Sequence, residues 1–460
     1  MKDTAFNKIW KLSPNVSQTE YYQELVQLTQ QIINEYKDQG RIDINPLESS
    51  RKRELSLPVD LLNDKLTNAT CIVTGGLGCI GSTLVTELLQ FDVHEIIVID
   101  KVDHNGIPLD ERITYYKCDI LDEEALAQIF NKHNPQIVFH TAAQRNPGLA
   151  EQKISETIDT NVFGTLNMVR TAENTPSVRH FVFSSTGKAS RYFTEEIYAA
   201  TKKICEYLLE VTSKESSIIY SMARFTHIVD NSLMDREIHE SVLTDPYVKI
   251  HNPGKFVTAQ NAKEAAYLLL NALIYCDEKK CNFLLVRYLE WPVESLELAL
   301  YYISTFKKSI PIIFIGNPLG YTEKFFRGQM DWSKPADLNL LINVYENRFR
   351  RLNEEGDIII SNILECSGTV LNRCLDNLRS ATSDQEARSS LIAGLKDIVK
   401  ETLVSADKRD TVSILNWGLD KKILEVEHAK AEDYGPIIPL LFQSLEGTPH
   451  FNQIEHLLEF

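Results

Sequence analysis

Apolar positions follow two alternating patterns between residues 68 and 250. Short runs rich in β-branched residues predict strands, and apolar residues at three- and four-residue spacing between them predict helices. The runs occupy residues 72–73, 95–100, 113–119, 136–140, 179–185 and 218–224. Strands that alternate with helices predict a doubly wound α/β fold, in which right-handed crossovers join the strands of a parallel sheet.

The flanking regions carry other patterns. Apolar residues at helical spacing between Tyr21 and Tyr36 precede a polar linker, whereas the last third of the chain carries helical stripes. Between them, two further helix–strand pairs predict a smaller lobe that closes over a substrate. We therefore expect four regions: a helical N-terminal extension (1–66), a central α/β domain (67–250), the smaller lobe (251–334) and a mainly helical C-terminal region (335–460).

Composition restricts the class of protein. The 460 residues are 43% hydrophobic and 24% charged, which is typical of a globular protein with a sizeable core. The net charge of −16 argues against broad binding to nucleic acid or to an anionic membrane. With no signal-peptide pattern and no run of 18 apolar residues, we expect a cytoplasmic protein without membrane insertion.

Eight cysteines are present, but they form no Cys-x-x-Cys pair and no cluster with histidine. Several lie inside apolar strand or helix patterns. We therefore expect buried, reduced thiols and no metal site.

Residues 71–81 carry the strongest chemical signal, Cys-Ile-Val-Thr-Gly-Gly-Leu-Gly-Cys-Ile-Gly. A strand, a glycine turn and a helix in this order are typical of a dinucleotide-binding fold. Gly75 permits the tight turn, Gly78 lets the backbone approach a pyrophosphate, and Gly81 lets the helix pack closely on the strand. The N-terminus of the following helix offers free N–H groups and a partial positive charge to phosphates.

A second strand ends at Asp100, 19 residues after Gly81. An acid at this distance meets the adenosine ribose hydroxyls in dinucleotide-binding folds. Lys101 follows directly and could instead favour a 2′-phosphate. The cofactor is therefore NAD or NADP, and the choice between them stays open.

Tyr198 and Lys202 form a Tyr-x3-Lys pair in a predicted helix, so the two side chains share a face. We expect the Lys202 ammonium to lower the pKa of the Tyr198 phenol, which then accepts a proton from a sugar hydroxyl. The strand before this helix ends in Ser184-Ser185-Thr186, whose hydroxyls can bind the same substrate oxygen.

Together these motifs resemble the extended short-chain dehydrogenase/reductase superfamily. Within it, the chain is most similar to the polysaccharide-biosynthesis UDP-N-acetylglucosamine 4,6-dehydratases. The resemblance covers roughly residues 68–330. The matching stretches are 74–82, 118–122, 138–143, 160–167, 183–189 and 198–202.

The resemblance implies an NAD(P)-dependent enzyme that acts on a nucleotide sugar and assembles as a homo-oligomer. We expect no nucleic-acid partner. It assigns Tyr198 as the base at the sugar C4 hydroxyl, Thr186 as its orienting group, and Lys188 and Lys202 as further catalytic residues. It implies cofactor contacts for Gly75, Gly78, Cys79, Ile80, Gly81, Asp100, Lys101, Asp119, Ile120, Ala142, Ala143, Asn161, Ser184, Tyr198 and Lys202.

One position departs from the dehydratase pattern. The family usually carries Thr-Asp-Lys after the strand, whereas this chain has Thr186-Gly187-Lys188. Elimination of water needs an acid–base pair, and glycine supplies neither group. Glu195 or Glu196 could replace the missing acid. Residues 320–324 partly match the family's glycine-glutamate-lysine stretch.

Three hypotheses remain open at this stage: a 4,6-dehydratase, a nucleotide-sugar 4-epimerase or dehydrogenase, and a catalytically inactive NAD(P)-binding interaction protein. Retention of Tyr198, Lys202 and Thr186 argues against the third, because a binding module does not need all three. His140, at the end of a strand, is interpreted as a satisfied core histidine rather than a catalytic group.

Overall fold

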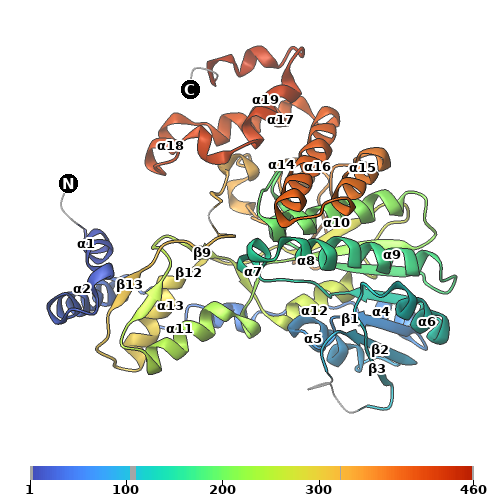
Figure 1. Ribbon diagram of the computed structural model, residues 1–460, viewed down its shortest axis with the longest axis horizontal. Helices are drawn as coiled ribbons and strands as arrows, with labels where there is room; N and C mark the ends of the chain where they lie inside the picture. Colours follow the sequence, from blue (N-terminus) through green and yellow to red (C-terminus); the bar gives the residue numbers. More distant parts are fainter. Residues whose placement is uncertain (1–3, 104–109, 322, 458–460) are drawn as a thin grey trace. The chain divides into compact units, whose positions relative to one another are not determined.

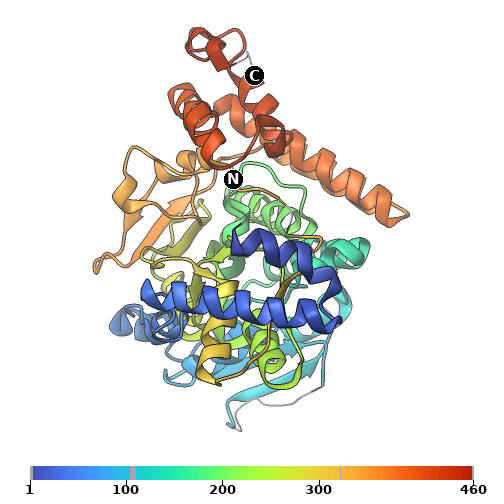
Figure 2. The same ribbon diagram turned by 90° about the vertical axis from the view of Figure 1, so that its left-hand side faces the viewer.

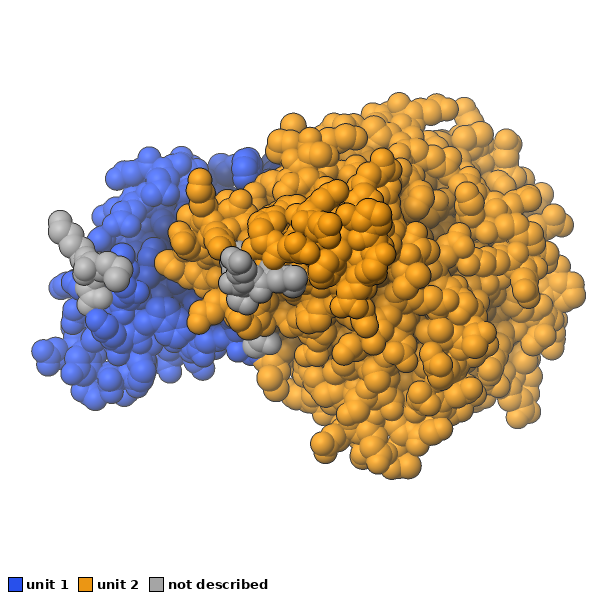
Figure 3. Space-filling view, turned by 90° about the horizontal axis from the view of Figure 1, so that it is seen from above, with its two compact units in different colours: residues 1–54, 226–264, 289–318 blue, residues 55–225, 265–288, 319–460 orange. Residues whose placement is uncertain are grey.

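The computed structural model describes residues 4–103, 110–321 and 323–457. The chain divides into two compact units, coloured separately in Figure 3. Unit 1 consists of residues 1–54, 226–264 and 289–318. Unit 2 consists of residues 55–225, 265–288 and 319–460. Each unit has its own sheet segments and its own buried residues.

Unit 2 is built on a nine-stranded sheet with the order β14-β15-β11-β6-β5-β4-β1-β2-β3. Strands β1 to β6 run parallel to one another, in the 3-2-1-4-5-6 order of a doubly wound dinucleotide-binding fold, and β11 runs parallel to β6. The predicted fold class is therefore confirmed. The strands are β1 (Thr70–Thr74), β2 (Glu95–Asp100), β3 (Ile113–Lys117), β4 (Ile137–His140), β5 (His180–Thr186), β6 (Ile219–Phe225), β11 (Asn282–Val286), β14 (Arg351–Leu352) and β15 (Ile358–Asn362).

Helices flank this sheet (Figure 1). Every residue of β1, β4 and β5 is buried, which explains why these strands read as continuous apolar runs rather than as alternating ones. The helices of this part are α4 (Val59–Leu66), α5 (Cys79–Leu88), α6 (Glu123–His133), α7 (Pro147–Gln152), α8 (Ile154–Ile158), α9 (Gly164–Glu173) and α10 (Ile197–Ser213). Helix α12 (Ala262–Asn271) spans the boundary of the units.

The sheet continues beyond the predicted domain. Strand β15 pairs antiparallel with β11, with Leu285 opposite Ile359, and β14 pairs antiparallel with β15. The sequence predicts mainly helices after residue 335 and misses these two strands. The short apolar run at residues 358–360 carries the signal, because it is too short for a helix.

The rest of the C-terminal region is helical, as predicted. It comprises α14 (Val344–Asn347), α15 (Gly368–Arg379), α16 (Asp384–Ser405), α17 (Lys408–Gly418), α18 (Lys421–Val426) and α19 (Ile437–Leu445). Helix α16, with 22 residues, is readily followed in Figure 2. Because α15 and α16 pack on α10, 14 of the 17 residues of α10 are buried. The C-terminal region thus forms one body with the central domain.

Unit 1 contains α1 (Ala5–Leu12), α2 (Thr19–Asp38), α3 (Glu48–Lys52), α11 (Leu233–Thr244) and α13 (Ser295–Thr305). Its short strands pair as β7 (His227–Ile228) with β10 (Ala259–Gln260), β8 (Val248–Ile250) with β13 (Ile312–Phe314), and β9 (Phe256–Val257) with β12 (Val293–Glu294). Its core joins Ile9 and Leu25 from the first helices to Leu298 and Phe314. The N-terminal helices therefore share a core with residues 226–264 and 289–318, whereas the sequence separates them as an extension.

Six of the eight cysteines are buried, as expected. Among the residues that the structure describes, no group of three or more His, Cys, Asp or Glu side chains is arranged to hold a metal ion. Within the same described ranges, no helix is both long enough and apolar enough to cross a membrane.

Candidate functional site

The glycine turn lies between β1 and α5 and has little free space. Gly75 has a φ of +67°, and a Cβ there would lie 2.7 Å from the backbone of Ala142. A Cβ at Gly81 would collide with the carbonyl oxygen of Gly75. Gly78 is the N-cap of α5 and provides no side-chain cap, so the first N–H groups of the helix stay available to an anion. Only glycine fits this close approach of strand, turn and helix.

Asp100 lies at the end of β2 and contacts the glycine turn directly. Its carboxylate accepts hydrogen bonds from the backbone N–H groups of Leu77 at 3.0 Å and Val102 at 3.4 Å. Lys101, next along the chain, is exposed. The structure thus brings Asp100 to the phosphate-binding turn, although 19 residues separate it from Gly81.

Asp119 and Ile120 follow β3, at the same edge of the sheet. Asp119 accepts a hydrogen bond from the backbone of Leu121 at 3.0 Å. Ile120 is buried against Gly164, where an added Cβ would lie 2.5 Å from its Cδ1. Asn167 donates to the Ile120 carbonyl at 3.2 Å, which fixes this segment to α9.

Asn161 lies in a π-helical turn (Asp159–Phe163) between α8 and α9. Its side-chain amide donates to the Gln144 carbonyl and to the Thr201 hydroxyl, both at 3.1 Å, and accepts from the Gln144 backbone at 2.8 Å. Thr201 in turn donates to the Tyr198 carbonyl at 2.8 Å. Asn161 therefore connects the loop after β4 with the helix that carries Tyr198. π-Helical turns occur frequently at functional sites.

His140 is fully buried at the end of β4. Its Nδ1 lies 2.7 Å from the Thr74 hydroxyl, and its Nε2 lies 3.0 Å from the Thr165 hydroxyl. Burial, together with the charge of Lys202, lowers the pKa of His140 to about 3. The ring stays neutral near pH 7 with both nitrogens satisfied, as the core interpretation predicts.

Tyr198, Lys202 and Thr186 lie at the carboxyl end of β5 and the start of α10. The Thr186 side chain lies near enough to the Tyr198 phenol to favour a lower pKa there, and its hydroxyl accepts a hydrogen bond from the Lys188 backbone at 3.3 Å. The buried Lys202 ammonium donates to the Ser184 carbonyl at 2.8 Å and lies 4.4 Å above the ring of Phe183. Burial lowers the pKa of Lys202 to about 8.

The expected tuning of Tyr198 by Lys202 needs correction. Burial raises the pKa of the phenol, and the interactions that lower it come from the Thr186 hydrogen bond and the Arg145 charge. The sequence predicts a lowered pKa from the i, i+4 spacing alone. In the structure the Lys202 ammonium is instead engaged with the carbonyl of Ser184.

Lys188 belongs to a cluster of charges beside this site. Its ammonium lies 2.6 Å from the Glu196 carboxylate and 3.3 Å from the Gly320 carbonyl. Glu195 is exposed, so of the two acids weighed from the sequence only Glu196 contacts Lys188. Residues 320–324 also reach this cluster through Glu323, whereas Thr322 lies outside the described residues.

The space beside Gly187 is filled by a residue from the C-terminal region. A Cβ on Gly187 would lie 2.5 Å from Cγ of Leu341, which is buried. The Leu341 backbone is in turn held by the Asn339 side chain at 2.9 Å. The acid of the dehydratase pattern therefore has no room at this position.

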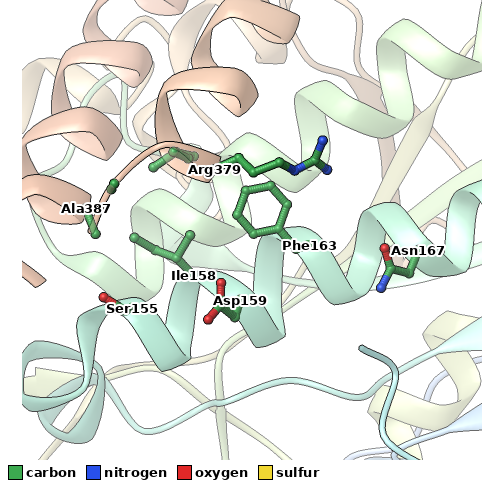
Figure 4. Close-up of a pocket in the computed structure, with 9 residues that line it drawn as sticks. Ser155, Ile158, Asp159, Phe163, Asn167, Arg379 and Ala387 are labelled. Carbon is green, nitrogen blue, oxygen red and sulfur yellow. The ribbon is translucent and has the colours of Figure 1, made fainter. Parts of the chain in front are cut away.

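A cavity of about 350 Å³ opens between the α8–α9 segment and the turn from α15 to α16 (Figure 4). Asp159 and Phe163 line it on one side, and Arg379 lies 5.1 Å above the Phe163 ring. None of the residues predicted for catalysis or cofactor binding lines this cavity.

Several contributors to the site escape sequence reasoning. Arg191 and Glu323 complete the Lys188 cluster, and Leu341 fills the space at Gly187. The partial match of residues 320–324 to the family's glycine-glutamate-lysine stretch is the sequence feature that could have identified Glu323. For Leu341 the sequence carries none, because an apolar residue 154 positions from Gly187 indicates no particular contact.

Comparisons with known proteins agree with this geometry. The profile of the family described as "Polysaccharide biosynthesis protein" matches residues 71–232. The capsular polysaccharide biosynthesis protein CapD of Staphylococcus aureus is 27% identical over 194 residues, which cover 39% of this chain and 32% of that protein. The chain thus spans about a third of the length of the first curated relatives it matches.

Two further comparisons cover more of the related protein. The UDP-glucose 4-epimerase of Klebsiella pneumoniae is 34% identical over 123 residues, which cover 25% of this chain and 87% of that protein. The X-ray structure of Pen from Bacillus thuringiensis superposes with a TM-score of 0.55 at 21% identity, covering 65% of this chain and 87% of Pen. At 21% identity, the superposition with Pen shows a similar fold and no more.

We expect Gly187→Ala to lower the free energy of unfolding by about 1–3 kcal/mol, because the new methyl group overlaps Leu341. Combining it with Leu341→Ala should cost less than the sum of the two single changes, since the second change removes the overlap. Urea unfolding followed by circular dichroism measures all three free energies.

Gly148→Ala is the matched control, since its new Cβ would approach nothing closer than 3.4 Å. We expect this change to stay within about 0.5 kcal/mol of the parent. A Gly187→Ala protein as stable as the parent would contradict the packing described here.

Proposed function

Because the chain belongs to the extended short-chain dehydrogenase/reductase superfamily, we propose that it is an NAD(P)-dependent enzyme that oxidises C4 of a nucleotide sugar. The observation that carries the proposal is the position of Thr186 beside Tyr198, at the carboxyl end of the sheet, where the glycine turn also begins. Ligands bind at this edge of open α/β sheets.

The residues at the edge of the sheet suit a dinucleotide. Gly75 and Gly81 let the strand, turn and helix pack closely, and the N-terminus of α5 carries a partial positive charge that favours a phosphate. Asp100 provides a carboxylate for ribose hydroxyls, and Asn161 orders the neighbouring loop. When bound, the nicotinamide supplies the acceptor for the hydride that leaves the sugar carbon.

Side chains of the protein then take up the proton of the sugar C4 hydroxyl. Tyr198 accepts the proton of the C4 hydroxyl, and the neighbouring Thr186 orients that hydroxyl. Lys202 fixes the helix to β5 through the Ser184 carbonyl. Because burial raises the pKa of Tyr198, we expect the proton transfer to accelerate as pH rises above 7.

The reaction that follows oxidation has two candidates. In a 4,6-dehydration, Lys188 takes part in removing water across C5 and C6, and its contact with Glu196 supplies a carboxylate nearby. The second candidate is 4-epimerisation, which needs no elimination pair. The packing of Leu341 against Gly187, which excludes an acid there, favours it.

Tyr198→Phe tests the proposed base. Purified full-length protein is incubated with UDP-N-acetylglucosamine, UDP-glucose and dTDP-glucose, and mass and stereochemistry of the sugars are measured. We expect conversion to fall by about 10²–10⁴-fold, because the phenol hydroxyl is the proton acceptor. The rise of rate with pH should disappear in the same variant.

Tyr207→Phe is the control, since it removes a buried phenol from the same helix further along the chain. Its conversion rate should match that of the parent. Full activity of Tyr198→Phe, or no conversion of any sugar by the parent, would overturn the proposal.

Asp100→Asn tests the adenosine end of the site. A carboxylate at this position attracts ribose hydroxyls and repels a 2′-phosphate, so we expect the parent to bind NADH more tightly than NADPH. The substitution should reduce the ratio of the NADPH dissociation constant to the NADH dissociation constant by about tenfold, or about 1.4 kcal/mol. Fluorescence titration measures both affinities, and the exposed Asp103→Asn serves as the control. An unchanged ratio would remove Asp100 from the binding site.

A further inference from the structure

Two segments of unit 2 build a chain of alternating charges beside Tyr198. The Lys188 ammonium lies 2.6 Å from Oε2 of Glu196, and Nη1 of Arg191 lies 3.1 Å from the same oxygen. Nη1 of Arg191 also lies 3.0 Å from Oε2 of Glu323. We call Lys188, Arg191, Glu196 and Glu323 the charge cluster. It places two carboxylates and two cations around Lys188, the residue that follows Gly187.

The two carboxylates of the charge cluster differ in their surroundings. The Glu196 side chain is 7% exposed and contacts both cations of the charge cluster. The Glu323 side chain is 27% exposed, and its Oε2 also accepts from the Thr194 hydroxyl at 2.6 Å. Burial raises the pKa of Glu323, with a further increase from Glu196 that opposes the cations. The surroundings of Glu323 therefore favour its protonated form more than water would.

The segment that delivers Glu323 is seated against the predicted active site. The Lys188 ammonium lies 3.3 Å from the Gly320 carbonyl and 5.1 Å from the centre of the Tyr321 ring. Gly320 has a φ of +80°, and a Cβ there would lie 2.8 Å from the Pro147 carbonyl oxygen. Tyr321 also acts electrostatically on Tyr198. Glu323 thus lies near the proposed base and is held there by Arg191 and the Thr194 hydroxyl.

Lys188 has the complementary property. Burial lowers its pKa, which raises the fraction of neutral amine able to accept a proton. An acid and a base with pKa values moved toward each other are the arrangement that an elimination requires.

We propose that Glu323 donates the proton to the departing C6 hydroxyl, in place of the acid that Gly187 cannot supply. This inference rests on the proposed function, because C4 must first be oxidised to a ketone by the nicotinamide dinucleotide. The C5 proton then passes to the Lys188 amine, and the electron pair of the C5–H bond forms the C5–C6 double bond. The C6–O bond breaks, and the oxygen leaves as water with the proton of Glu323.

Glu323→Gln separates this step from oxidation. Full-length protein is mixed with UDP-N-acetylglucosamine, and two signals are followed: the absorbance of reduced nicotinamide and the loss of water by mass. We expect the variant to reduce the nicotinamide as the parent does while losing water at least about 100-fold more slowly. Parent water loss should also decline as pH rises through the pKa of Glu323, because the donor must be protonated, and the variant should lack that decline.

Glu195→Gln is the matched control, because it neutralises an exposed carboxylate next to the charge cluster and should leave both signals unchanged. Glu323→Asp keeps the acid on a shorter side chain and should recover part of the water loss, which distinguishes proton donation from folding.

Three results would overturn the inference. The first is water loss by Glu323→Gln at the parent rate, and the second is no recovery in a folded Glu323→Asp protein. The third is a parent protein that reduces nicotinamide with the sugar but releases no water, which would leave the proposed oxidation standing. A parent that reduces no nicotinamide at all refutes the proposed function itself.

Discussion

The architecture of the site depends on one fully buried cation, Arg224, at the end of β6. Its guanidinium donates to Glu206 at 2.7 and 2.9 Å, to Glu346 at 2.7 and 2.8 Å, and to the Leu341 carbonyl at 3.0 Å. Burial alone would lower the pKa of Arg224, but the two carboxylates raise it above its ordinary value. Removing one member of such a network leaves an unpaired buried charge, at a cost of about 3–5 kcal/mol.

This network joins the parts that the chemistry needs. Glu206 lies one helical turn after Lys202 on α10 and also accepts from the Ser185 hydroxyl at 2.5 Å. Glu346 belongs to α14 in the C-terminal region. The end of β5, the helix of the proposed base and the C-terminal region are therefore held at one point. The same attachment keeps Leu341 against Gly187, so one set of ionic bonds both orders the proposed active site and excludes an acidic side chain from position 187.

The sequence predicts the parts of the site whose chemistry is local. The glycine turn, Asp100 and the Tyr198–Lys202 pair follow from spacing along short stretches of chain, and the parallel sheet follows from the alternation of strands and helices. It does not predict contacts between segments far apart in the chain, such as Leu341 with Gly187 or Glu323 with Arg191. It also fails for the pKa of Tyr198, because burial is a property of the whole fold and spacing reports only the neighbouring charge.

The central claim is that hydride leaves C4 of the sugar while Tyr198 takes the hydroxyl proton. Turnover of UDP-N-acetylglucosamine that carries deuterium at C4 tests it most directly. We expect a primary isotope effect on nicotinamide reduction and transfer of the deuterium to the reduced nicotinamide. Conversion at an unchanged rate, with the deuterium never leaving C4, would contradict it.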